Sequence, residues 1–256
     1  MPLTKVNTLV FCFWSFAFNS FAYNIEPYAK QVPYKSESAL NLVFCSLNYQ
    51  AQGDFTKDIG IIIQKLKKTR PFDEFTNFKF WYINFSKQEE NNLFKPTSAF
   101  PPLKVRKDLL ADIQAQLKCE YKLIIIDARG SVCCAELSSI DKMSLIIIGK
   151  ARYKDSSGFA KGFLHELGHS LGLRDECVHC QQLSSAGYPN CAATKEEAVK
   201  WWGDLAGKDE RVNYISGCSG NKDYLRPTIA SLMNDPDKAE DFGPVNERYL
   251  RKVLGD

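Results

Sequence analysis

Two histidines and a glutamate near the middle of the chain have types and spacing suited to metal chemistry. His165 and His169 are four residues apart, in an apolar segment that repeats with helical periodicity. On a helix this spacing places both imidazoles on one face, where their nitrogens can bind a single zinc ion at about 2.0–2.1 Å. Glu166 is not placed to join the same ligand set, but it can reach a water bound to that ion and accept its proton.

Asp175 is the predicted third ligand, because the chain turns back soon after the two histidines. Gly172 is able to adopt a positive φ, which lets the chain leave the helix sharply, and Asp175 follows three residues later. Glu176 and His179 are the alternative third ligands. Two histidines and one aspartate leave a coordination position open, as a catalytic zinc requires. With Glu166, the pattern predicts one catalytic Zn²⁺ in a metallopeptidase, rather than histidines that serve only the core or a helix cap.

The first 22 residues have the order of a secretory signal peptide. Lys5 precedes an apolar run over residues 9–18, and the small residues Ser20 and Ala22 resemble a cleavage site. The apolar run is shorter than the roughly 20 residues that span a bilayer; the alternatives are an N-terminal anchor or a buried strand. We therefore predict cleavage near Ala22, a secreted or periplasmic location, and a mature chain without a membrane span.

The nine cysteines indicate an oxidising environment for the mature chain. Signal cleavage removes Cys12 and leaves eight, an even number that permits up to four disulfides. We expect the neighbouring Cys133 and Cys134 to have different partners. The alternative is a closed structural zinc site formed by Cys177, His179 and Cys180 with another cysteine, which oxidation in an exported protein would prevent. The eight cysteines are Cys45, Cys119, Cys133, Cys134, Cys177, Cys180, Cys191 and Cys218.

Apolar periodicity predicts an α/β fold in which helices cover a sheet. Continuous apolar or aromatic runs of strand length occur at residues 40–45, 78–85, 123–127 and 145–148. Helical spacing of apolar residues covers 55–68, 107–119 and 159–171, and a last helix begins near Pro244. Residues 86–105 are polar and interrupted by prolines, and are predicted to form a loop.

These elements divide the chain into four parts. Residues 1–22 are the signal peptide, 23–39 a leader, 40–172 an N-terminal α/β lobe with the zinc helix, and 173–256 a C-terminal lobe. Because the chain is rich in Cys, Gly and Asn from Gly172 to about residue 230, this second lobe is expected to be small and disulfide-rich. The net charge of +3 does not indicate nucleic-acid binding, and the mature chain is expected to be a soluble monomer.

The stretch from His165 to Asp175 resembles the long zinc-binding signature of the metzincin metallopeptidases. Members of this family carry a methionine turn after the zinc helix, and Met233 within Ser231–Asn234 matches it. The narrower resemblance is to the bacterial immunoglobulin-A-peptidase family, through Leu42–Phe44, Tyr224–Thr228 and Phe242–Asn246. That family tends to carry one more residue between the glycine and the aspartate than this chain does.

The resemblance implies a metzincin-like zincin fold. A twisted mixed sheet with helices lies above a cleft, the zinc helix forms the floor of the cleft, and a smaller C-terminal lobe ends in a helix. In many relatives an edge strand binds the substrate as an additional strand, and Leu145–Ile148 is expected near that edge. Some relatives place a tyrosine two residues after the methionine to stabilise the transition state. That position is Asp235 here, so Tyr224 or Arg226 is the candidate stabiliser.

Together these features predict a secreted zinc endopeptidase. His165, His169 and Asp175 would hold the ion, and Glu166 would deprotonate the zinc-activated water that attacks the peptide bond. The expected partner is a protein or peptide in an extended conformation. Two other functions use the same scaffold: a secreted binding module that no longer cleaves, and a zinc amidase that acts on cell-wall peptides.

Overall fold

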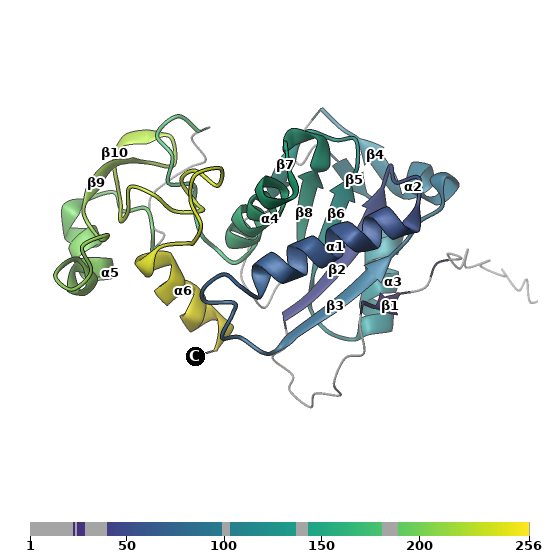
Figure 1. Ribbon diagram of the computed structural model, residues 1–256, viewed down its shortest axis with the longest axis horizontal. Helices are drawn as coiled ribbons and strands as arrows, with labels where there is room; N and C mark the ends of the chain where they lie inside the picture. Colours follow the sequence, from purple (N-terminus) through teal and green to yellow (C-terminus); the bar gives the residue numbers. More distant parts are fainter. Residues whose placement is uncertain are drawn as a thin grey trace, which may run out of the picture.

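The computed structural model describes residues 23, 25–28, 40–98, 103–136, 143–180 and 189–255. At its centre lies a twisted six-stranded sheet in the order β1-β3-β2-β6-β8-β7 (Figure 1). The inner strands are parallel to one another, and the outer strands β1 and β7 are antiparallel to their neighbours. In the order of the sheet, the strands cover Glu26–Pro27, Phe78–Ile83, Leu40–Leu47, Tyr121–Asp127, Ser144–Gly149 and Cys133–Ala135.

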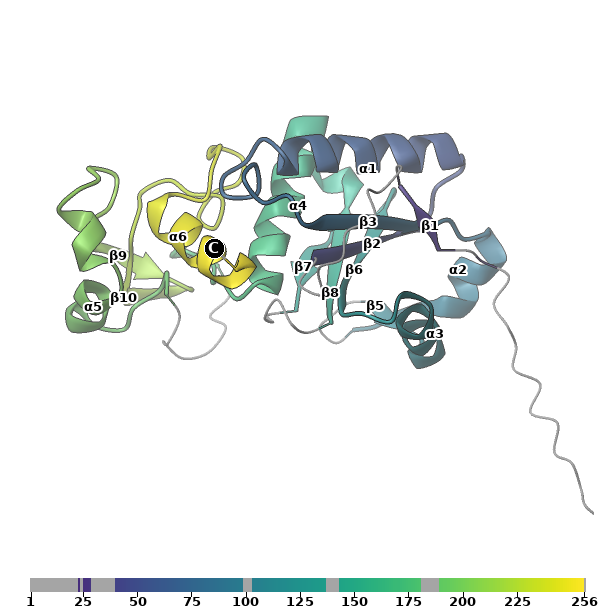
Figure 2. The ribbon, with the colours of Figure 1, turned by 90° about the horizontal axis from the view of Figure 1, so that it is seen from below.

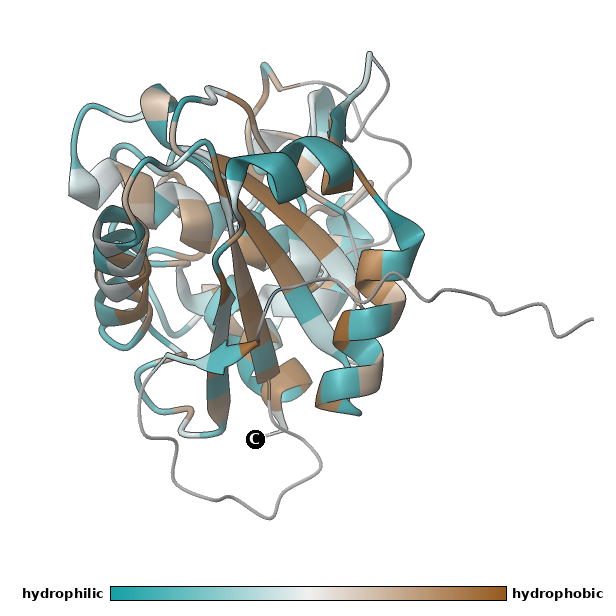
Figure 3. Ribbon diagram, turned by 90° about the vertical axis from the view of Figure 1, so that its right-hand side faces the viewer, coloured by the Kyte–Doolittle hydropathy of each residue, from teal (hydrophilic) through white to brown (hydrophobic). Residues whose placement is uncertain are grey.

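Helices cover both faces of the sheet, which explains why its central strands are apolar without alternation. Every residue of β2 and β8 is buried. Helices α1 (Gln52–Leu66) and α4 (Ser156–Ser170) pack on one face, and α3 (Lys107–Leu117) packs on the other (Figure 2). Figure 3 shows the apolar strands enclosed by helices with hydrophilic outer faces. The predicted mixed α/β class is confirmed.

The C-terminal region, residues 173–255, carries less regular structure. It contains α5 (Lys195–Ala206), an antiparallel hairpin of β9 (Ile215–Cys218) and β10 (Asn221–Arg226), and α6 (Pro244–Leu254). The hairpin and α5 lie on the far side of α6 from the sheet (Figures 1 and 2). In the described part of the chain, no helix has the length and apolar character needed to cross a membrane.

The segment predicted as a loop, residues 86–105, is partly regular. Helix α2 (Lys87–Leu93) begins at Ser86, whose hydroxyl forms a capping box with Glu89. Strands β4 (Phe94–Pro96) and β5 (Leu103–Val105) then pair antiparallel. The loop prediction was wrong because α2 buries only Glu90 and Leu93 and so has no apolar stripe to read.

The sheet edge near α4 is formed by a strand that was not predicted, although Leu145–Ile148 lies next to this edge as expected. Leu145–Ile148 belongs to β8, which pairs with β6 on one side and with β7 on the other. The edge strand is therefore β7, and within the described residues no strand pairs with its outer side. Three residues are too few to produce a readable period-two pattern, which is why β7 was not predicted.

Within the described residues the cysteines form two disulfides, Cys177–Cys180 and Cys191–Cys218. The side chains of the neighbouring Cys133 and Cys134 pack into the clusters on opposite faces of the sheet, and neither forms a disulfide among the described residues. The predicted signal peptide, residues 1–22, lies outside the described residues. Of the predicted leader, only residues 23 and 25–28 are described, and β1 in this stretch pairs with β3.

Candidate metal centre

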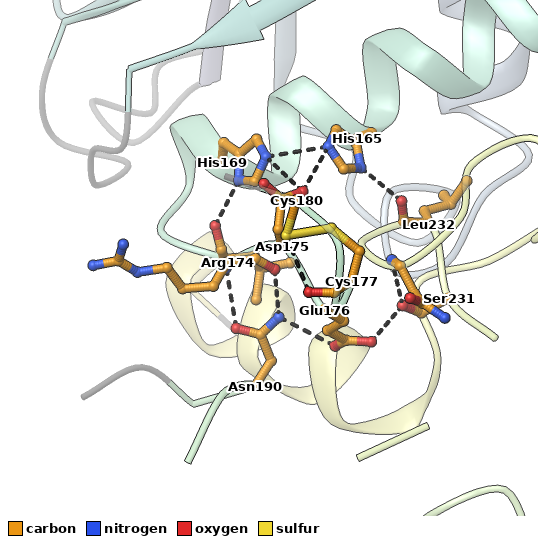
Figure 4. Close-up of polar contacts among 12 residues, drawn as sticks. His165, His169, Arg174, Asp175, Glu176, Cys177, Cys180, Asn190, Ser231 and Leu232 are labelled. Atoms are coloured by element: carbon orange, nitrogen blue, oxygen red, sulfur yellow. Dashed lines mark hydrogen bonds and ion pairs between the residues drawn. A yellow bond between two sulfur atoms is a disulfide. The ribbon is translucent and has the colours of Figure 1, made fainter. Parts of the chain in front are cut away.

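Helix α4 and the loop after it bring three potential ligands together (Figure 4). The Nε2 atoms of His165 and His169 are 3.1 Å apart, and the Oδ1 atom of Asp175 lies 3.2 Å from the first and 3.4 Å from the second. Ligand atoms around a tetrahedral zinc at 2.0–2.1 Å are about 3.3 Å apart. The three donor atoms therefore form a triangle of the size that one zinc ion requires.

The second ring nitrogen of each histidine contacts a backbone carbonyl. The Nδ1 atom of His165 lies 2.7 Å from the oxygen of Leu232, and that of His169 lies 2.9 Å from the oxygen of Leu173. A carbonyl only accepts, so each Nδ1 carries a hydrogen, and each Nε2 is left to bind a proton or a metal cation at the shared point. This outer contact is the usual way in which metal-binding histidines are oriented.

The electrostatics of the three groups favour a positive charge between them. Burial alone would lower the pKa of His165, but its hydrogen bond to Asp175 and the charge of Glu166 outweigh burial and raise that pKa to about 9. Burial acts in the opposite direction on Asp175, yet its contacts with both histidines hold the pKa of its carboxyl well below the usual range. A metal cation bound by all three groups would supply this positive charge.

Asp175 reaches this position because the chain reverses after α4. Gly172 has φ 103°, a left-handed conformation that favours glycine, as predicted from its place after the histidines. The Leu173 amide then donates to the carbonyl of Gly168 across the turn. On the far side, the Ser219 amide donates to the backbone oxygen of Asp175 at 2.9 Å. The predicted third ligand is thus anchored to the β9–β10 hairpin rather than to the helix.

Met233 lies directly beneath the helix that carries the histidines. It is fully buried, and a Cβ atom placed on Gly168 would lie only 2.6 Å from its sulfur. The Met233 carbonyl accepts a 2.7 Å hydrogen bond from the amide of Glu176, the residue after the third predicted ligand. The predicted methionine turn is therefore in contact with the backbone of both ligand-bearing segments.

Glu176 and His179, the alternative third ligands, do not join this group. The Glu176 carboxylate is fully buried and accepts hydrogen bonds from Ser231 at 2.5 Å, Asn246 at 2.8 Å and Asn190 at 3.1 Å. These donors come from the methionine turn, from α6 and from the loop before α5, so Glu176 links three segments around Asp175. Sequence reasoning missed this role, since nothing in the pattern marks that glutamate as buried.

Glu166 lies in a cleft of about 930 Å³ that also contains the three ligands. Its carboxylate makes no hydrogen bond to any described residue, and the side chain is 6% exposed. Burial raises the pKa of Glu166, while the nearby imidazoles of His165 and His169 act to lower it. A carboxylate with a raised pKa and a free face toward the cleft is suited to accepting a proton.

The two predicted transition-state stabilisers lie elsewhere. Neither Tyr224 nor Arg226 lines the cleft. The Arg226 guanidinium donates to the backbone oxygens of Gly217, Glu176 and Thr228, at 2.6, 3.2 and 3.2 Å, and so braces the hairpin. Asp235 does line the cleft, but its carboxylate forms an ion pair with Lys238.

Comparison with known proteins gives only distant structural likenesses. No family model matches the chain, and no curated protein matches it. Among solved structures, the crystal structure of archaemetzincin from Methanopyrus kandleri is similar over 86% of this chain and 97% of that chain, with 12% sequence identity and a TM-score of 0.40. A likeness of this degree assigns neither family nor function. The narrower resemblance to the immunoglobulin-A-peptidase family finds no support in these comparisons.

Proposed function

We propose that this protein is a zinc-dependent endopeptidase. The observation that carries the proposal is the triangle of His165, His169 and Asp175 donor atoms, with the Glu166 carboxylate in the same cleft. The donor set of two imidazoles and one carboxylate suits zinc and leaves a position for water or substrate. Two disulfides, which persist in oxidising compartments, support the proposal that the chain is exported after removal of residues 1–22.

Each residue of the cleft has a distinct task in this proposal. When bound, zinc would polarise the scissile carbonyl and lower the pKa of water. Glu166 accepts the proton from the attacking water and passes it to the amine that leaves. The backbone carbonyls of Leu232 and Leu173 hold the two imidazoles in the tautomer that frees Nε2.

The edge strand β7 is the proposed binding element for the substrate. Its three residues all line the cleft, and its outer backbone groups have no strand partner among the described residues. An extended peptide can satisfy these groups by adding itself to the sheet. The proposed substrate is accordingly a protein or peptide in an extended conformation, bound across the metal ligands.

Glu166→Gln tests the proposal, because it keeps the size of the side chain and removes its basicity. We expect zinc content to stay at about one ion per chain, and turnover of casein to fall by about 10²–10⁴-fold. Zinc is measured by elemental analysis, and Glu210→Gln, an exposed residue outside the cleft, is the matched control.

Three results would contradict the proposal. Normal hydrolysis by Glu166→Gln would exclude its role as the base. Loss of zinc in the same variant would make the glutamate a ligand instead. An inability of zinc-loaded wild type to cleave any unstructured protein would favour a binding module, or a cell-wall amidase if the protein released peptides from peptidoglycan.

A further inference from the structure

Two positive charges in the cleft are not neutralised by this chain. Arg152 and Lys154 are exposed, line the cleft, and make no ion pair within the described residues. Three other charged side chains of the cleft are engaged with groups of this chain. Lys161 forms an ion pair with Glu240. Asp235 forms an ion pair with Lys238 at 2.9 Å. Asp155 caps α4 by accepting a hydrogen bond from the Gly158 amide at 2.8 Å.

Arg152 stands at the beginning of the edge strand. Arg152 ends the short 3-10 helix η1 (Lys150–Arg152), which opens the loop between β8 and α4. This segment runs beside the residues leading into β7, since the Gly149 amide donates to the Val132 carbonyl and the Ala151 amide donates to the Gly130 carbonyl, both at 2.9 Å. Cys133, the first residue of β7, contacts Gly149 through its sulfur. These bonds lie on the β8 side of the chain and place Arg152 at the Cys133 end of β7. Because Arg152 lines the same cleft as all three residues of β7, a peptide paired with the outer side of β7 would share that cleft with Arg152.

Arg152 shares the cleft with the proposed base. The cleft that Arg152 lines also contains Glu166 and all three residues of β7. The Arg152 guanidinium also acts to lower the pKa of the Cys133 thiol, which burial raises. Arg152 thus lies in one cleft with both the base and the strand along which a substrate is proposed to bind.

We propose that Arg152, with Lys154 beside it, selects substrates that carry an acidic side chain within two residues of the bond that is cut. This inference rests on the proposed peptidase function. A guanidinium offers a planar pair of donors that matches a carboxylate and forms two parallel hydrogen bonds with it. Lys154 adds a second positive charge on the same loop, so the carboxylate meets a cationic surface rather than a single group.

The opposite wall of the cleft carries an acidic residue, so an acidic substrate side chain is expected to be favoured at one end of the cleft only. Asp237 lies on the segment after the methionine turn, is exposed, and has no ion pair within the part of the chain that the structure describes. An acidic substrate side chain near Asp237 would be repelled, whereas a basic one would be attracted. The cleft is therefore expected to prefer an acidic side chain at the Arg152 end only.

The test begins with a peptide that the zinc-loaded protein cleaves and whose cut bond is located by mass spectrometry. The two residues on each side of that bond are replaced one at a time by Glu, Gln or Lys. We expect one position at which Glu raises kcat/KM about 10- to 100-fold over Gln, the range of a hydrogen bond to a charged group.

Charge reversal then identifies the residue responsible. Arg152→Glu should invert the preference at that position, so that the Lys peptide is cleaved faster than the Glu peptide, and Arg152→Lys should keep part of the original ratio. Because ratios are compared within one variant, any effect of Arg152 on the basicity of Glu166 cancels. Lys222→Glu makes the same charge change on β10, outside the cleft, and should leave the ratio unaltered.

Binding provides a reading that does not depend on turnover. In the Glu166→Gln background, the Kd of fluorescent Glu and Gln peptides should differ by a similar factor, and Arg152→Glu should remove the difference. Cleavage of Glu and Gln peptides at equal rates at every position would overturn the inference and leave the peptidase proposal intact. Absence of cleavage by wild type would refute the peptidase proposal, and the Kd ratio would then decide whether Arg152 recognises carboxylates.

Discussion

His165 and His169 stand on a helix that is packed into an apolar core, whereas Asp175 stands on a loop held by polar contacts and a disulfide. Phe163 and Leu167 of α4 are fully buried against the sheet and α1. The C-terminal region adds Met233 and α6 to the same core, but its hairpin and α5 surround only a small separate cluster. The Asp175 loop contains the buried carboxylate of Glu176, and the Cys191–Cys218 disulfide lies beside it, with the Cys218 sulfur 3.5 Å from the Asp175 backbone oxygen.

The three predicted ligands therefore do not depend on the same forces. The two histidines are set in place when the sheet and α4 fold, because apolar burial orders that helix. The aspartate depends on interactions that oxidation and hydrogen bonding supply. Changes to the core should therefore act on overall stability, and changes to the loop should act on metal affinity more than on the rest of the fold.

The largest effect on stability is expected from Phe163→Ala in the core of the N-terminal region (residues 40–172). The side chain is fully buried beside Phe44, and its truncation should lower the free energy of unfolding by about 3–5 kcal/mol. Urea unfolding at equilibrium measures this loss. Val199→Ala, a half-exposed residue on α5, is the control and should change stability by less than about 0.5 kcal/mol. Equal losses in the two variants would contradict an apolar origin of α4 stability.

Cys191→Ser combined with Cys218→Ser should weaken the C-terminal region. This disulfide closes a loop with a sequence separation of 27, and its removal should cost about 2–4 kcal/mol. Because Ser219 follows Cys218 and donates to Asp175, zinc affinity should also fall, as measured by competition with a chelator. Cys119→Ser, a half-buried thiol of the N-terminal region without a disulfide, is the control. Unchanged zinc affinity in the double variant would separate the hairpin from the metal centre.

The two regions also differed in how far their structure could be predicted. Continuous apolar runs predicted the four parallel strands, and helical spacing predicted α1, α3, α4 and α6, because apolar burial determines these elements. Helix α5 was missed in a segment read as irregular, although Thr194 caps it by accepting from the Glu197 amide. In the N-terminal region, α2 was missed for a similar reason, since a capping box rather than an apolar stripe marks it.

At the candidate site, too, local sequence patterns predicted some residues and missed those that depend on contacts between distant segments. Spacing alone placed His165, His169 and Asp175 within reach of one ion, because a helix turn and a flexible glycine fix their separation. Burial of Glu176 depends on donors from segments 14 to 70 residues away in the chain, which no local pattern reveals. Arg226 was misjudged for the same reason, as its partners are backbone oxygens brought together by folding.

Glu176→Gln tests whether Glu176 positions Asp175 or is itself a metal ligand. Three donors, from Ser231, Asn246 and Asn190, converge on its carboxylate, and an amide at this position must turn its own donor toward at least one of them. The expected loss of stability is about 1–3 kcal/mol. Zinc should still bind, with lower affinity, because Asp175 remains. Complete loss of zinc by elemental analysis, in a protein that is still folded, would instead identify Glu176 as a ligand.

The smallest expected effect concerns Glu247 on α6, a charged group in the C-terminal region that is only 9% exposed. Burial, followed by the charge of Asp241, raises its pKa above the ordinary value of 4.5, although Arg211 acts to lower it. Because folding raises the pKa of this carboxyl, its ionisation costs more free energy in the folded state than in the unfolded state. This cost appears as pH increases from 4.5 through the raised pKa. The folded state binds more protons than the unfolded state in that window, so stability falls with increasing pH.

Glu247→Gln removes this ionisation and should flatten that part of the profile. Urea unfolding followed by tryptophan fluorescence at pH 4.5 and pH 7 measures the change, since Trp202 packs in the same small cluster as Val245 of α6. The gain of the variant over wild type should be larger at pH 7 than at pH 4.5. An equal gain in stability at pH 4.5 and pH 7 would mean that Arg211 stabilises the Glu247 carboxylate in the folded state. The packing of α6 would then be as independent of pH as the apolar core beneath α4.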